Sequence, residues 1–130
     1  MGLSARQVGE LVEELAALVV GAELRGVQPV PPRDLLLVFT PAAGETLRVR
    51  LSADAEGGRL HLQSGPVKRH EGPADPFFAR LEAAASGAVL HALEQVQGDR
   101  VVRFVFRRDG APAGALLAEL TGRHGNLVRL

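Results

Sequence analysis

The sequence predicts an α+β fold, an antiparallel β-sandwich flanked by two helices. Apolar residues recur with helical spacing in two short stretches only, at 4–20 and 77–86. Most of the other apolar segments alternate with a period of two and follow one another in two groups, which favours hairpins over βαβ units. Hydrophobic residues make up 46% of the 130, enough for the core of one domain.

The first helix is expected over residues 4–20. Ser4 is expected to be the N-cap, with Gln7 completing a capping box, and Gly21 is expected to end the helix. Six apolar residues recur at helical spacing on one face: Val8, Leu11, Val12, Leu15, Leu18 and Val19.

A first group of four strands is expected after this helix. The residue ranges are 23–30, 34–40, 46–51 and 59–63. In the third of these strands apolar residues alternate with Arg48 and Arg50, which places the two arginines on the outer face of the sheet.

A second helix is expected over 77–86, after a proline- and glycine-rich loop at 64–76. Asp75 and Pro76 suit its start. A second group of strands should follow at 88–96, 100–108, 114–120 and 126–130. In the strand at 100–108 the inward residues should be Val102, Phe104 and Phe106. Because the chain stops within an expected strand, we expect the single domain of residues 1–130 to belong to a longer parent.

Composition excludes several classes of function. The chain has no cysteine, which rules out disulfides and thiol catalysis, and its formal net charge of zero argues against a strongly electrostatic nucleic-acid binder. The four histidines share no metal-ligand spacing, and no nucleophile–base pair is evident. We therefore expect a protein that is not an enzyme, with no catalytic residue, metal or cofactor. No signal peptide or apolar run of membrane-spanning length is present, and we expect a cytoplasmic location without membrane partners.

Two turns carry charged residues that a turn does not need. Asp99 and Arg100 follow Gly98 between two expected strands. Either Asp99 bonds the local backbone and Arg100 points to solvent, or the pair is exposed for recognition. Arg123 and His124 lie between two glycines in "ELTGRHGNLV", as solubilising residues or as a cationic tip that meets a partner.

The order of these segments resembles the N-terminal domain of the NFACT family, the RqcH-like or fibronectin-binding protein A-like proteins of ribosome quality control. The resemblance rests on "LVEEL", "VQPV", "LRVRLSADAEGGRLHLQ", "PFFARLEAAASGAVLHALEQ", "GDRVVRFVF" and, most specifically, "ELTGRHGNLV". It implies RNA binding, with tRNA and the obstructed large ribosomal subunit as partners. It also implies a fold similar to the N-terminal domain of formamidopyrimidine-DNA glycosylases. Asp99 and Arg100 map onto residues that the family needs for C-terminal tailing, and Arg123 and His124 map onto its Gly-Arg-His turn.

The chain departs from the family at several positions. Ser4-Ala5 replaces the usual Asp-Gly, Asp54-Ala55 replaces His-Pro, Gly125 replaces a serine, and "LEAAA" stands where a basic segment is usual. We therefore expect the chain by itself not to perform the whole of the family's task.

Two rival functions remain at this point. One is a protein-interaction domain without RNA binding, which would be favoured if the outward arginines 48, 50, 103 and 107 scatter over both sides of the fold. The other is a glycosylase-like enzyme domain. It is disfavoured because Gly2-Leu3 stands where such enzymes have an N-terminal proline nucleophile.

Overall fold

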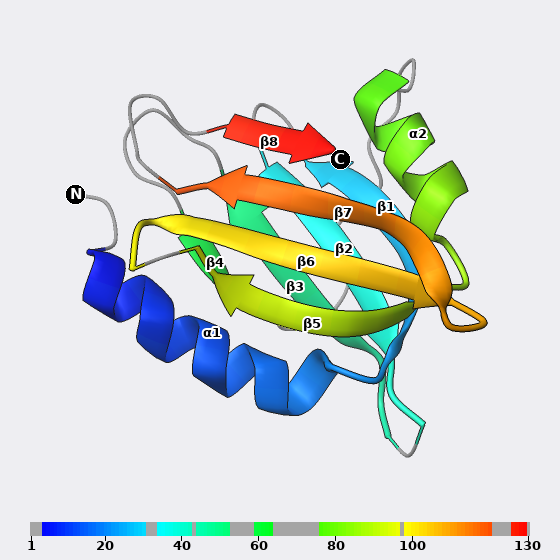
Figure 1. Ribbon diagram of the computed structural model, residues 1–130, viewed down its shortest axis with the longest axis horizontal. Coiled ribbons are helices and arrows are strands. Elements are labelled where there is room, and N and C mark those ends of the chain that lie inside the picture. Colours follow the sequence, from blue (N-terminus) through cyan, green and yellow to red (C-terminus); the bar gives the residue numbers. More distant parts are fainter. Residues whose placement is uncertain are drawn as a thin grey trace.

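All the strands of the described chain belong to one antiparallel sheet, with the order β4-β3-β2-β1-β5-β6-β7-β8 (Figure 1). The structure, a computed structural model, describes residues 4–30, 34–42, 44–52, 59–63, 76–96, 98–120 and 126–129. Its elements are α1 (Ala5–Val19), β1 (Glu23–Val30), β2 (Asp34–Thr40), β3 (Leu47–Ser52), β4 (Arg59–Leu62), α2 (Pro76–Ala85), β5 (Val89–Gln95), β6 (Val101–Arg108), β7 (Ala111–Glu119) and β8 (Asn126–Arg129).

The antiparallel pairing and the two helices are as the sequence predicts, but the two separate sheets of a sandwich are not found. Strands β1–β4 and β5–β8 form two halves that are joined where Glu23 pairs with Val89. Figure 1 shows β5, β6 and β7 crossing in front of the other half. The rings of Phe39 and Phe106, one from each half, stack at 6.5 Å between centroids, so the core lies between the halves. The sheet is thus continuous and folded over on itself.

Helix α1 begins with the capping box that the sequence predicts. Ser4 Oγ accepts from the backbone N–H of Gln7 at 3.1 Å, and Gln7 Oε1 accepts from the N–H of Ser4 at 2.8 Å. The face of α1 that packs along β5 carries the buried residues Val8, Val12, Leu15 and Val19.

Replacing Ser4 by alanine should lower the free energy of unfolding by about 1 kcal/mol, because the N–H of Gln7 then loses its side-chain acceptor. Urea denaturation monitored by circular dichroism measures this loss. Thr46→Ala is the control, since Thr46 is exposed and lies outside the helices and strands. It should change stability by no more than about 0.5 kcal/mol. Equal effects of the two changes would show that the cap does not stabilise the domain.

Helix α2 is held to the sheet at three points. Leu81 and Ala85 are buried against β1 and β7. The Glu82 carboxylate accepts from the N–H of Val27 at 3.0 Å, just after the shift in the register of β1 between Leu24 and Gly26. Arg108 Nη2 donates to the carbonyl of Ser86 at 2.6 Å, at the C-terminal end of the helix, where a positive charge is favourable.

Candidate functional site

Asp99 and Arg100 lie in the tight connection between β5 and β6, as predicted. Gly98 adopts φ +70°, the left-handed conformation that glycine tolerates. The N–H of Asp99 donates to the carbonyl of Val96 at 2.9 Å, and the N–H of Leu120 donates to the carbonyl of Arg100 at 2.7 Å. The backbone of this connection is therefore fixed both within itself and to the chain just after β7.

The two side chains differ in what they contact. Asp99 Oδ1 accepts from the N–H of Arg100 at 2.7 Å, which is the local backbone bond that one of the two interpretations expects. Asp99 is exposed, and its carboxylate keeps acceptor capacity after one such bond. Arg100 is half-buried, and within the described residues its guanidinium forms no ion pair or hydrogen bond. Both groups can therefore still bind a partner.

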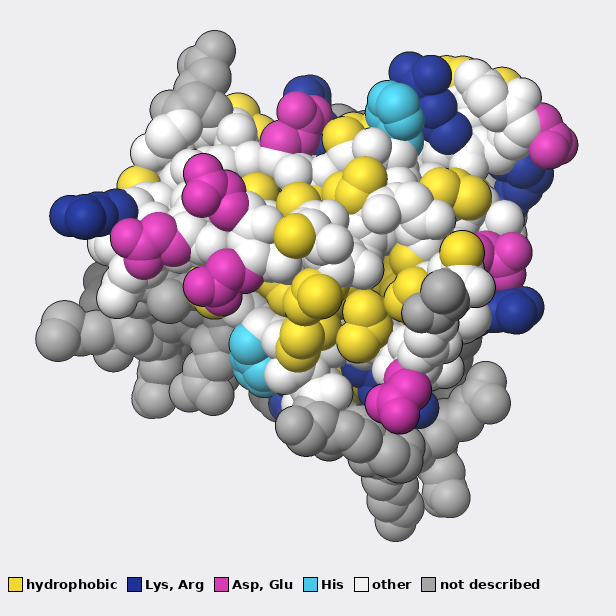
Figure 2. Space-filling view, turned by 90° about the horizontal axis from the view of Figure 1, so that it is seen from below, with side chains coloured by type: hydrophobic (Ala, Val, Ile, Leu, Met, Phe, Trp, Pro, Cys, Tyr) yellow, Lys and Arg dark blue, Asp and Glu magenta, His cyan; other side chains and the backbone are white. Residues whose placement is uncertain are grey.

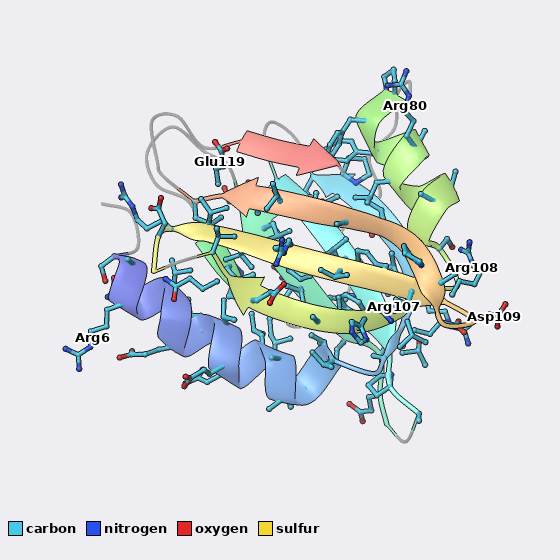
Figure 3. The ribbon with its side chains drawn as sticks, viewed as in Figure 1. Arg6, Arg80, Arg107, Arg108, Asp109 and Glu119 are labelled. Atoms are coloured by element: carbon cyan, nitrogen blue, oxygen red, sulfur yellow. The ribbon has the colours of Figure 1, made fainter. Side chains whose placement is uncertain are left out.

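Three elements meet around this connection. Gln95 Nε2 donates to the carbonyl of Ala5 in α1, and β7 ends at Glu119 beside Val101. We call the group formed by the first turn of α1, residues 98–100 and Glu119 the turn end. Figure 3 labels Arg6 and Glu119 at this end of the molecule, and Arg107, Arg108 and Asp109 at the opposite end. The turn end is thus well separated from the arginines of the β6–β7 connection.

Arg123 and His124 lie outside the described residues, so their predicted role stays a prediction. The strands on either side of them are described: Glu119 of β7 pairs with Asn126 of β8. Both of these strand ends lie beside the β5–β6 connection, because Glu119 also pairs with Val101.

The outward arginines of the strands do not form a common surface. Arg48 and Arg50 are on β3, in one half of the sheet, and Arg103 and Arg107 are on β6, in the other. Arg50 Nη2 lies 2.7 Å from Asp34 Oδ2, and Arg103 pairs with Glu94. This scatter is what the protein-interaction alternative expects.

The exposed surface of α1 is acidic. Glu10, Glu13 and Glu14 are exposed, and Figure 2 shows acidic side chains gathered on the face of the molecule seen from below. Phosphates are repelled by such a surface.

Within the described ranges, no group of three or more histidine, cysteine, aspartate or glutamate residues is arranged to hold a metal ion. In the same part of the chain, neither helix is long and apolar enough to cross a membrane.

This folded-over antiparallel sheet with two helices is also the fold of N-terminal domains of streptococcal fibronectin-binding proteins. The chain is similar to the N-terminal domain of fibronectin-binding protein PavA from Streptococcus pneumoniae, with a TM-score of 0.86, 23% identity, and coverage of 97% of this chain and 48% of that one. It is also similar to the N-terminal part of the fibronectin/fibrinogen-binding protein from Streptococcus suis, with a TM-score of 0.82, 21% identity, and coverage of 92% and 46%.

The family follows from the sequence. Residues 7–129 match the model of the NFACT N-terminal and middle domains, and the chain belongs to this family. It is 27% identical over 124 residues to the Rqc2 homolog RqcH of Streptococcus pneumoniae, which covers 91% of this chain. The chain spans 22% of the length of that curated relative. The family predicted from the sequence motifs is thereby confirmed.

Proposed function

We propose that this domain is a non-enzymatic, cytoplasmic module that contacts RNA through the turn end, and that its target is tRNA on an obstructed large ribosomal subunit. Membership of the NFACT family and the similarity to an RqcH protein support the proposed ribosomal target. The observation that carries the site is the β5–β6 connection, whose backbone is fixed by hydrogen bonds while Asp99 is exposed and the Arg100 guanidinium has no partner among the described residues.

The chemistry of the two side chains suits RNA. The guanidinium of Arg100 can bind a phosphate or stack on an unpaired base, and it is the stronger of the two contacts. The carboxylate of Asp99 only accepts hydrogen bonds, so it suits a ribose hydroxyl or a base amino group. Zero net charge and the acidic surface of α1 make long-range attraction weak, so we expect the domain alone to bind RNA with micromolar affinity at best.

Arg100→Ala should weaken binding of the 130-residue chain to tRNA by about tenfold or more, because it removes a charge-assisted hydrogen bond to the RNA. Binding is measured by fluorescence anisotropy at several salt concentrations. The slope of log affinity against log salt should flatten by about 0.7 to 0.9 for each phosphate that is no longer bound. Asp99→Asn keeps an acceptor for the N–H of Arg100 but removes the negative charge and one acceptor oxygen, so a weaker affinity there reports on the carboxylate.

Arg107→Ala is the matched control, because Arg107 is exposed at the opposite end of the molecule. It should leave affinity unchanged within about twofold. If Arg100→Ala and Arg107→Ala weaken binding equally, the interaction is diffuse and the turn end is not its site. If even the natural chain does not bind tRNA at low salt, the proposed function itself fails.

The second candidate, a protein-interaction module without RNA binding, is favoured by a specific observation. Among the described residues, large hydrophobic side chains are exposed at Leu18, Val20, Leu62 and Val89. Apolar side chains also gather on the face shown in Figure 2. Absence of tRNA binding at low salt, with the domain folded, would favour this candidate.

A further inference from the structure

Gln95, the last residue of β5, links the turn between β5 and β6 to helix α1 through hydrogen bonds of its side chain. Its Nε2 donates to the carbonyl of Ala5 at 2.7 Å and to the carbonyl of Asp99, also at 2.7 Å. Both acceptors are carbonyl oxygens, so only the amino end of the side-chain amide can face them. The two N–H groups are both used, and the orientation of the amide is thereby determined.

The oxygen of the same amide gives a reason for the glycine at position 9, within helix α1. Gln95 Oε1 would lie 2.7 Å from a Cβ placed on Gly9, closer than real side chains approach. Glycine is unfavourable in a helix interior compared with alanine. Its presence at this position makes room for the Gln95 amide, which a larger residue would push away from its two carbonyl acceptors.

We propose that Gln95 is a positioning residue for RNA binding at the turn end. It joins the carbonyl of Asp99 to the first residue of α1, and so holds the adjacent Arg100 side chain in one place relative to the helix. This inference rests on the proposed function, because it needs RNA to meet that connection. A binding loop that is already fixed loses less conformational freedom on association. These two hydrogen bonds of Gln95, which we call the Gln95 clamp, therefore raise affinity without touching the RNA.

The test uses Gln95→Met, which keeps the length of the side chain and removes both donors. Affinity of the 130-residue chain for tRNA should fall about two- to tenfold. This factor corresponds to the net free energy that a typical hydrogen bond contributes. The Arg100→Ala and Gln95→Met changes are then combined in a double-mutant cycle. If Gln95 acts by placing Arg100, the double variant should bind no more weakly than Arg100→Ala alone, within about twofold.

Gly9→Ala tests the same clamp without altering Gln95. It should weaken tRNA binding in the natural chain and have no further effect in the Gln95→Met chain. Gly44→Ala is the control, since a Cβ there meets no atom within 4 Å. Melting temperatures of all variants establish that they are folded.

The outcomes separate this inference from the function on which it rests. If Arg100→Ala weakens binding and Gln95→Met does not, the positioning role is wrong and the proposed function stands. Effects that multiply in the double variant would likewise overturn the positioning role, because they would show that Gln95 acts independently of Arg100. If Arg100→Ala has no effect on binding, both the proposed function and this inference fail.

Discussion

Replacing Phe104 by alanine should lower the free energy of unfolding by about 3–5 kcal/mol. Phe104 is 0% exposed in β6 and pairs with Leu93 of β5 and Leu116 of β7, both buried. Removing the ring takes away buried apolar surface and leaves a cavity that these neighbours cannot fill. Since domains of this size have a stability of roughly 5–15 kcal/mol, the variant should be largely unfolded well below the melting temperature of the natural chain.

Urea denaturation measures the loss of stability, and Val89→Ala is the control on the neighbouring strand. Val89 is 42% exposed, so this control measures the effect of a lower strand propensity with little loss of buried surface. A cost for Phe104→Ala of less than about 1 kcal/mol would contradict the placement of the ring in the core. It would mean that the strand is shifted by one residue, which turns every side chain to the other face.

Leu81→Ala should cost about 2–5 kcal/mol, because Leu81 is the large, fully buried side chain that packs α2 against the sheet. The bonds made by Glu82 and Arg108 remain, so the change tests the packing alone. Urea denaturation gives the stability. Hydrogen exchange at the N–H of Val27, which is bonded to Glu82, shows whether α2 detaches before the domain unfolds.

Leu18→Ala is the matched control for this prediction. It makes the same change on a helix, at a side chain that is 47% exposed. We expect a cost of no more than about 1 kcal/mol there. If the two leucines cost the same, α2 does not contribute to the core in the way that the burial of Leu81 indicates.

Local sequence pattern predicted the bounds of most elements to within one residue, because alternation and caps are local properties. The strands at 23–30 and 34–40 are observed with the predicted bounds, and the capping box of Ser4 and Gln7 is confirmed. β7 begins at Ala111, three residues before the prediction. The added residues include Pro112, which pairs with Arg107 of β6 beside a shift in register. Tertiary pairing there overrides the local preference of proline.

The single sheet could not be predicted in this way. It depends on the pairing of Glu23 with Val89, two residues that are far apart in the sequence.

The candidate site was predicted in part. The position of Asp99 and Arg100 in a turn followed correctly from Gly98 and the flanking strands. The clamp of Gln95 was missed, since a polar residue at the end of a strand is ordinary. Gly9 was the available signal, because a glycine inside a helical pattern usually has a packing reason.

The strand order also has a consequence for the order in which the chain folds. Within β1–β4 and within β5–β8, each described strand pairs with its neighbour in the sequence. Such short-range pairs close small loops and form quickly. Pairing of β1 with β5 must wait for a much longer loop to close. We expect two meanders to form first and the Phe39–Phe106 stack between them to be completed late, so that substitutions at this stack mainly accelerate unfolding.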